Sequence, residues 1–267
     1  MAQVRAWTMN LNTKIRLLQI LNHLVSIPAI IYTISTSQWY LLIISVCVWF
    51  FIGPISNVIT LHRLLTHRSF KTHQWLENAL SLVSVISTVG PTLSWVAVHR
   101  VHHASSDTKT DPHSPNKDNK FNFKQALHVW WGYDWKIPQV STKLVKDLLR
   151  NPIHMFIFKH YFKIIFVFSL VLLFIDPILW VYAYAVPASL TVHLVGIVNV
   201  LGHVHGYRNY ETRDMSTNSW IANIFSLGDG WHNNHHATAN NSYAGEKWWE
   251  WDLMGRVINV IRTDKVS

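Results

Sequence analysis

The chain has 267 residues, of which 49% are hydrophobic, and it contains 14 Trp, 17 His and a single Cys. This composition argues against an ordinary soluble protein and favours a membrane protein. One Cys excludes a disulfide framework, a Cys-rich zinc site and a thiolate-held iron–sulfur cluster. The formal net charge of +9 suits nucleic acid, anionic lipid or a phosphate-bearing ligand equally, so the positions of the charges have to decide.

Four apolar stretches are long enough to cross a membrane, which takes about 20 residues in a helix. They cover residues 17–35, 39–61, 156–175 and 178–200, and short connections at 36–38 and at Asp176-Pro177 join them into two hairpins. All 23 Lys and Arg lie outside these stretches, apart from Lys159 and Lys163 at the start of the third. Because basic residues stay on the cytoplasmic side, we expect both termini and the segment 62–155 in the cytoplasm.

The segments between the spans predict a helical cap. Residues 76–98 carry a polar stripe and are interrupted by Gly90-Pro91, which predicts an interfacial helix. Residues 105–122 are rich in Asp, Lys, Pro and Asn, which predicts a loop, and residues 121–161 mix Trp with basic residues, which predicts surface helices at the head-group level. The expected fold is an all-α integral membrane protein of one domain, residues 1–267. It has four transmembrane helices and a cytosolic helical cap made by 62–155 and 201–267.

Four groups of histidines stand at the cytoplasmic ends of spans or in cytoplasmic segments: HRLLTHR (62–68), HRVHH (99–103), NVLGH (199–203) and WHNNHH (231–236). In HRVHH and HNNHH the histidines are spaced i, i+3 and i+4, which places three imidazoles on one helix face, able to converge on a common point. His62 and His67 are spaced i, i+5, about 140° apart on an α-helix, so they converge only if the helix ends or bends, or if the ions lie between them.

These groups predict a centre for two metal ions, since nine histidines are too many for one. The predicted ligands are His62, His67, His99, His102, His103, His203, His232, His235 and His236, with Asn199 as a possible tenth, direct or through water. Imidazole leaves zinc, copper, iron and nickel open. Structural zinc usually takes thiolates, and the HExxH motif of many zinc enzymes is absent from the sequence, so redox-active iron is the favoured interpretation. We assign the isolated His23, His128, His154 and His160 to packing, and His193 to the bilayer interior.

At these residues the chain resembles the membrane fatty acyl desaturases, in particular the delta-9 acyl-CoA and acyl-lipid branch. The family boxes HRxxTHR, HRxHH and GWHNNHH and the nearby NxxxH stand here at 62–68, 99–103, 230–236 and 199–203. The resemblance runs from about residue 40 to the WWEWD of 248–252 and includes DPHSP (111–115) and GYR (206–208). Asp229 stands where the family usually has Glu, and His205 stands where several relatives have an aromatic residue.

The resemblance implies a mushroom-like shape and two iron ions held by the nine histidines, with Asn199 linked through water. The implied reaction is the dioxygen-dependent insertion of a cis double bond, at delta-9, into a saturated acyl chain carried on CoA or lipid. The sequence has no HPGG haem motif and no Cys cluster, so electrons have to come from a separate donor of the cytochrome b5, ferredoxin or rubredoxin type with its reductase. The other expected partners are membrane lipids, without nucleic acid. The expected location is a bacterial inner membrane or the endoplasmic reticulum, with the active site in the cytoplasm.

Further side chains are expected to support this site. Ligating histidines need their other ring nitrogen held, and Asp107, Asp111 and Asp229 are the nearest candidates, with His205 a possible addition. Cationic side chains suit the phosphates of an acyl donor or lipid head groups, and the candidates are Arg63, Arg68 and Arg100. The end of an acyl tunnel is expected near Phe50, Phe51 and Ile55.

Two alternatives stay open at this stage. A fatty acyl hydroxylase or acetylenase would share the scaffold and the first hydrogen abstraction. A di-haem cytochrome or a metal transporter would also use many histidines, but it would place them inside the spans rather than at their cytoplasmic ends.

Overall fold

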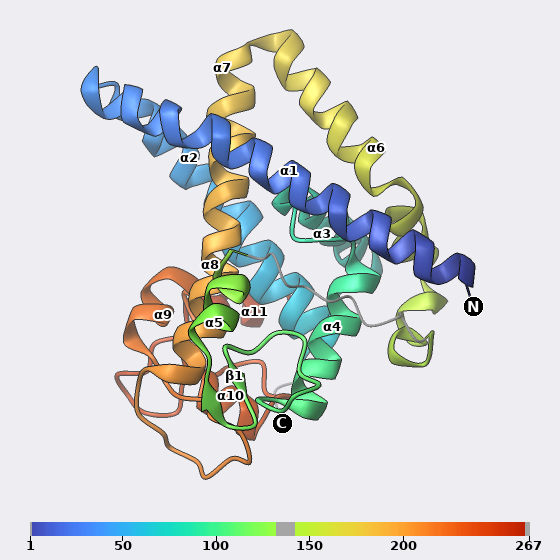
Figure 1. Ribbon diagram of the computed structural model, residues 1–267, viewed down its shortest axis with the longest axis vertical. Coiled ribbons are helices and arrows are strands. Elements are labelled where there is room, and N and C mark those ends of the chain that lie inside the picture. Colours follow the sequence, from blue (N-terminus) through green and yellow to red (C-terminus); the bar gives the residue numbers. More distant parts are fainter. Residues whose placement is uncertain (1, 132–141, 265–267) are drawn as a thin grey trace.

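The computed structural model describes residues 2–131 and 142–264, and these residues are mostly helical (Figure 1). Helix α1 (Ala2–Ser35) crosses the molecule obliquely. Helix α2 (Trp39–Phe50) continues into the π-helix η1 (Phe51–Thr66), and α6 (Pro152–Ile175) is followed by α7 (Pro177–Trp180), the π-helix η5 (Val181–Ala185) and α8 (Val186–Val204). Within the described residues, four helical stretches are long and apolar enough to span a membrane: 11–35, 39–66, 152–175 and 177–204. The sequence located all four, although each extends beyond its predicted bounds at one end or both.

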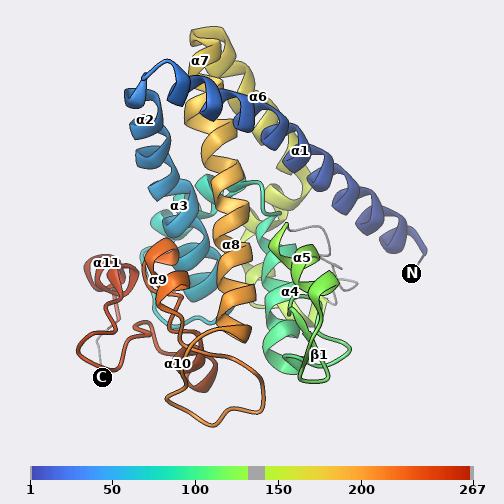
Figure 2. The same ribbon diagram turned by 60° about the vertical axis from the view of Figure 1, so that its left-hand side comes forward.

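Local sequence explains the turn between α6 and α7. Asp176 ends α6 in an extended conformation, and its Oδ1 accepts the Ile178 N–H at 2.8 Å. Pro177 takes the first helical position, where no N–H donor is needed. The chain therefore reverses within two residues, and α8 returns as the central helix, packed against α1, α2, α5 and α9 (Figures 1 and 2).

The C-terminal part of the second span, η1, is a π-helix, which the sequence did not predict. The N–H of His67 donates to the carbonyl of His62 at 3.1 Å, five residues back. The hydroxyls of Thr60 and Thr66 likewise donate to the carbonyls of Ile55 and Leu61 at 2.9 and 2.8 Å. Long π-helices are rare, and the i→i+5 pattern is usually confined to a single turn, often at a functional site. Here the side-chain hydroxyls bond in the same i−5 register as the backbone.

The segment predicted as an interfacial helix is broken at the expected place. Helix α3 (Gln74–Ser84) and the 3-10 turn η2 (Val85–Ser87) are followed by Thr88 and Gly90 with φ of 58° and 115°. Pro91 then starts α4 (Thr92–Ser105), which turns 85° away. One face of α4 packs into the main hydrophobic core through Leu93, Val96 and Ala97, and its far end carries the HRVHH histidines.

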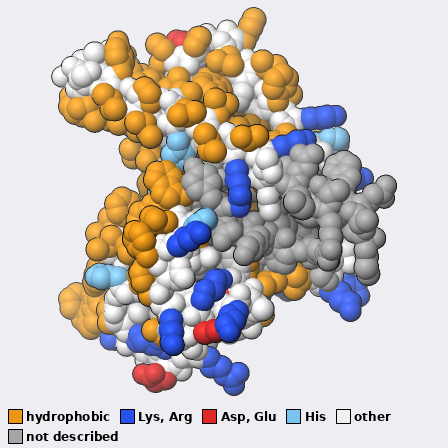
Figure 3. Space-filling view, viewed as in Figure 1, with side chains coloured by type: hydrophobic (Ala, Val, Ile, Leu, Met, Phe, Trp, Pro, Cys, Tyr) orange, Lys and Arg blue, Asp and Glu red, His pale blue; other side chains and the backbone are white. Residues whose placement is uncertain are grey.

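The remaining described elements are short. They are the strands β1 (Asn116–Lys117) and β2 (Lys120–Phe121), the helix α5 (Phe123–Trp130), the 3-10 turns η3 (Thr142–Val145) and η4 (Leu148–Arg150), and the helices α9 (Trp220–Ser226), α10 (His232–Ala237) and α11 (Leu253–Ile261). The two strands correct the prediction of a plain loop at 105–122 and of a purely helical chain. Of the predicted surface segment 121–161, α6 takes the end from Pro152 onward, and residues 132–141 lie outside the described residues. Hydrophobic side chains dominate the upper part of the face in Figure 3, and most Lys and Arg lie lower.

Candidate metal centre

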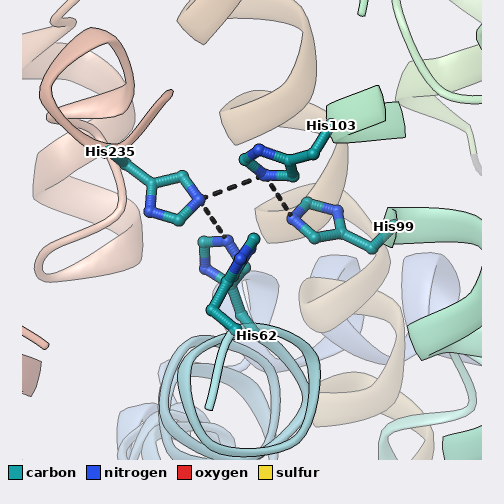
Figure 4. A group of neighbouring side chains, drawn as sticks. His62, His99, His103 and His235 are labelled. Atoms are coloured by element: carbon teal, nitrogen blue, oxygen red, sulfur yellow. Dashed lines mark hydrogen bonds between the residues drawn. The ribbon is translucent and has the colours of Figure 1, made fainter. Parts of the chain in front are cut away.

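Nine buried or half-buried histidines form two adjacent groups. The first contains His62, His67, His99, His103 and His235, and the second contains His102, His203, His232 and His236. Within each group, one ring nitrogen per residue lies within 4.8 Å of all the others. Figure 4 shows four members of the first group pointing toward one another from η1, α4 and α10. All nine histidines singled out by the sequence are therefore brought together.

Each i, i+3, i+4 triad divides between the two groups, so the expectation that its three imidazoles converge on one point is wrong. On α4, His99 and His103 belong to the first group, whereas His102 belongs to the second. On α10, His235 belongs to the first group, and His232 and His236 to the second. Residues i and i+4 lie on one side of a helix and i+3 is rotated from them, so one helix can serve two centres.

The π-helix explains how His62 and His67 meet. Their ring centroids are 4.9 Å apart, although on an α-helix they would point about 140° apart. In η1 the i→i+5 hydrogen bond stacks residues five apart along the helix. Convergence was expected only if the helix ended or bent, or if the ions lay between the two residues, and the chain brings the two rings together by a change of helix type.

The nitrogen atoms of the two groups fit a metal. In the first group, Nε2 of His62 lies 2.9 Å from Nε2 of His235, which lies 3.2 Å from Nε2 of His103. Nε2 of His67, His102 and His236 is buried without a hydrogen-bond partner. Buried polar atoms seldom stay unsatisfied, and convergent imidazole lone pairs are the donors that iron, zinc, copper and nickel accept.

Four carboxylates hold the other ring nitrogen of four of these histidines. The Nδ1–H groups of His62, His102 and His203 donate to Asp229, Asp111 and Asp107 at 2.7, 2.9 and 2.9 Å. These are the three aspartates that the sequence analysis named. Because a carboxylate only accepts, the proton stays on Nδ1 and the Nε2 lone pair faces the cluster.

The fourth carboxylate was missed. Nδ1 of His236 donates to Asp214 Oδ2 at 2.6 Å. Asp214 lies 22 residues from His236, outside the motifs, and no local pattern in the sequence signals the contact. Asn199, one turn before His203, donates to the Val195 carbonyl at 2.7 Å, and its Oδ1 is buried without a hydrogen-bond partner.

Burial keeps most of these imidazoles neutral. Burial, together with the neighbouring histidines, sets the pKa of His67, His99, His103, His232 and His235 well below the usual value. Burial also lowers the pKa of His236 to about 4. Burial opposes the charged form of His102 too, but the Asp111 carboxylate outweighs it and raises the pKa of His102. Neutral imidazoles beside charged carboxylates form the protonation state that metal binding requires.

Comparison with known proteins identifies the family of the chain. The family model described as "Fatty acid desaturase" matches residues 37–245. The chain belongs to the fatty acid desaturase family. It is 31% identical to the sn-1 stearoyl-lipid 9-desaturase of Anabaena variabilis, over 85% of this chain and 83% of the relative.

Two further relatives differ in their named position and acyl carrier. The delta-9 acyl-lipid desaturase 2 of Arabidopsis thaliana is 33% identical, over 78% of this chain and 67% of the relative. The acyl-CoA C20 delta5-desaturase of Anemone leveillei is 31% identical, over 85% of this chain and 70% of the relative. Membership of the family thus leaves both the carrier and the position of the double bond to be determined for this desaturase.

The three arginines considered for phosphate binding have partners inside the protein. Arg63 is 2% exposed and pairs with Asp229 and Asp252 at 2.9 and 2.7 Å. Arg100 pairs with Asp147 at 2.7 Å and donates to the carbonyls of Leu65, Thr66 and Leu144. Arg68 also pairs with Asp147 and Glu77, but its side chain is 37% exposed, more than those of the other two arginines. The expectation of phosphate contacts is therefore wrong for Arg63 and Arg100, which fasten η1 and α4 to the rest of the site.

A cavity of about 20 Å³, large enough for a water molecule, lies against both histidine groups in this desaturase. Its walls are Asn57, Val58, His62, Trp95, His99, Leu194, Val195, Val198, Asn199, Asp229 and His232. Phe50, Phe51 and Ile55 do not line it, and Phe51 is 58% exposed on the outside of the bundle. The tunnel end expected near these three residues is therefore not part of the described cavity.

The other histidines lie outside both groups. His154 is buried and contacts Thr92 and Glu77. His23 and His193 meet between α1 and α8 with their Nε2 atoms 3.2 Å apart. His205, which the sequence left as a possible supporting group, is exposed after the end of α8.

Proposed function

We propose that this chain is a delta-9-type desaturase that inserts a cis double bond into a saturated fatty acyl chain carried on a lipid or on CoA. The observation that carries the proposal is the pair of adjacent histidine groups, backed by buried carboxylates, beside a cavity with largely apolar walls. The Anabaena and Arabidopsis relatives, named as acyl-lipid 9-desaturases, support the position and the class of substrate.

The overall reaction takes two hydrogens from adjacent methylene carbons. With dioxygen, two electrons and two further protons it yields the alkene and two waters. An alkyl C–H bond has no polar handle for acid–base catalysis, so a cofactor must supply the oxidant and the protein must position it. Two iron ions bound at the histidine groups would supply this dioxygen chemistry.

The proposed ligands are the nine histidines of the two groups, with Asn199 completing the second group directly or through water. Asp107, Asp111, Asp214 and Asp229 hold Nδ1 protonated and fix each ring plane, so that the Nε2 lone pair is presented to the ion. Such support is usually worth roughly 10- to 100-fold in metal affinity or activity.

The cavity walls supply positioning and the exclusion of water. Val195 and Val198 of α8 and Trp95 of α4 face the space beside His62 and His99. The described cavity has room for about one water, so only a methylene-sized part of an acyl chain would lie against these walls, where it would be desolvated and held in one register relative to the histidine groups. We therefore assign the choice of carbon atoms to this surface rather than to Phe50, Phe51 and Ile55.

We further propose that the chain forms one membrane domain with its site at the cytoplasmic surface. All Lys and Arg of the sequence lie outside the hydrophobic cores of the spans, and the short connections 36–38 and 176–177 contain none. The basic residues therefore gather at one end of the spans, and the positive-inside rule identifies that end as cytoplasmic. A separate protein of the cytochrome b5, ferredoxin or rubredoxin type, with its reductase, would deliver the two electrons.

Expression in a host that lacks its own route to unsaturated fatty acids tests this function. The fatty acids are analysed as methyl esters, with double-bond positions mapped. His235→Ala serves as the inactive variant, and His73→Ala, an exposed histidine outside both groups, serves as the matched control. We expect cis-delta-9 monoenes with the natural chain and with His73→Ala, but not with His235→Ala.

Each other outcome has a defined meaning. A delta-5 product would keep the desaturase and reject the proposed position. Hydroxylated or acetylenic products would move the assignment to the alternative oxidases. No product from a protein that binds two irons, in a host supplied with all three donor types, would contradict the proposed substrate.

A further inference from the structure

Helix α9 carries its apolar residues on the outside and its polar residues on the inside. Trp220, Ile221, Ile224 and Phe225 are 41%, 46%, 58% and 45% exposed. Its inward residues Ala222, Asn223 and Ser226 are each fully buried. A surface helix in water shows the opposite arrangement, and a contiguous exposed apolar patch marks a binding surface. We call the four outward residues the α9 face.

The inward side of α9 is fixed, so the helix cannot rotate to bury this face. Ser219 caps the helix by accepting the Ala222 N–H at 3.3 Å, and Asn223 Nδ2 donates to the Trp251 carbonyl at 3.0 Å. The same carbonyl accepts Trp231 Nε1 at 2.8 Å, next to the histidines of α10. Rotation of α9 would leave buried polar groups unpaired, so the exposure of the α9 face is built into the fold.

The position of α9 indicates what covers it. It packs along the central spanning helix α8, and Figure 2 places it beside the lower half of that helix, above α10 along the long axis of the molecule. Figure 3 shows hydrophobic side chains over the same place. The α9 face thus continues the lipid-facing surface of the spans. It is not an isolated patch on the polar cap.

Helix α11 extends the same level of the molecule. The Met254 N–H at its start donates to the carbonyl of Leu227, which ends α9, at 3.0 Å. Leu253 and Val260 of α11 are 40% and 84% exposed, and Arg256 is exposed between them in sequence. A cationic side chain beside apolar ones suits the boundary of an anionic membrane, where the stem stays with the lipid tails and the charge reaches the head groups.

We propose that the bilayer is the occupant: the α9 face inserts into the boundary between head groups and acyl chains. In this position α9 ties the turn that carries Asp229, and with it the start of α10 at His232, to the membrane surface. The inference needs only the membrane spans and does not depend on the reaction that the histidine groups catalyse.

Spin labels on single cysteines test the insertion in the full-length protein. Cys47 is the only cysteine of the chain, so Cys47→Ser gives the background for Ile221→Cys and Ile224→Cys. Val171→Cys on α6, 52% exposed, is the lipid-facing reference. Lys109→Cys, whose side chain is 82% exposed, is the water-facing reference. The proteins are placed in vesicles of phosphatidylcholine and phosphatidylglycerol, and collisions with dioxygen and with a water-soluble nickel chelate are compared.

We expect labels at Ile221 and Ile224 to collide more often with dioxygen than with the nickel chelate, as at Val171, because dioxygen concentrates in lipid. The label at Lys109 should show the reverse. A ratio at both α9 positions like that of Lys109 would place the α9 face in water and overturn the proposal. Protection from both reagents would mean that protein covers the face, and that result would also overturn it.

Discussion

His62 donates its Nδ1–H to one oxygen of Asp229 at 2.7 Å, while the other oxygen of the same carboxylate accepts the guanidinium of Arg63, the next residue in the chain. One carboxylate therefore orients a proposed metal ligand and neutralises a buried cation. Asp252 bonds Arg63 from the other side at 2.7 Å. The ring plane of His62 is thus tied to the segment that precedes α10.

Asp229→Asn should lower iron content and desaturation together, by roughly 10- to 100-fold, because the amide no longer fixes the tautomer of His62 and leaves Arg63 with one carboxylate. Asp229→Glu keeps the charge and is expected to retain a measurable part of both. Iron per chain, measured by elemental analysis, and methyl-ester profiles check this. Equal iron content in the wild type and Asp229→Asn would contradict it.

The π-helix offers a second prediction. Thr66→Val removes the hydroxyl bond to the Leu61 carbonyl, in the turn that brings His62 to His67, so it should reduce iron content as well as stability, the latter by about 1 kcal/mol. Thr191→Val removes a bond of 2.8 Å to the Pro187 carbonyl in the α-helical part of α8 and should reduce stability alone. Unfolding in denaturing detergent and iron analysis separate the two effects. A matching iron loss in both variants would argue against a specific role of the π-turn.

The cavity gives a third prediction. Val198→Phe fills space in its wall, so we expect desaturation to fall on the order of 10- to 100-fold, or to move to shorter acyl chains, while iron content stays the same. Val171→Phe, with the same change on the lipid-facing surface of α6, should leave activity and products unchanged. Methyl-ester analysis of the two variants decides the matter. A normal product profile from Val198→Phe would place the acyl chain elsewhere.

A fourth prediction concerns pH. Burial lowers the pKa of His113, which lies outside both histidine groups, from 6.5 to about 3. The unfolded chain binds a proton at this residue before the folded one does, so its contribution to stability is present above pH 6.5 and decreases as the pH falls toward 3. From pH 7.5 to 5.5 the free energy of unfolding of the wild type should decrease by about 1 kcal/mol relative to His113→Gln. Parallel curves for the two proteins would show that His113 titrates normally in the folded state.

Periodicity and composition were enough to locate the four spans, because about 20 apolar residues in a row have few other uses. The gathering of nine histidines also followed from the motifs and from the resemblance, and Asp107, Asp111 and Asp229 were named as candidates to hold their ring nitrogens, although which histidine each would hold was not predicted. The role of Asp214 was not predicted, because its contact with His236 depends on the path of the connection between α8 and α9. The π-helix was missed because the residues of η1 suit an α-helix equally well, and packing around His62 and His67 selects between the two. Arg63 and Arg100 were misassigned because a sequence does not show which carboxylates a folded chain brings to them.

The division of each histidine triad between two groups has a consequence for how the site is assembled. Helices α4 and α10 each contribute to both histidine groups, so neither group has its full set of imidazoles until α10 has docked. Ribosomes deliver the chain from its N-terminus, and η1 and α4 are made long before residue 232. Three of the four spans can therefore be in the membrane while the second group has only His102. Both histidine groups of the proposed site are therefore completed in one late step, when α10 is made and docks.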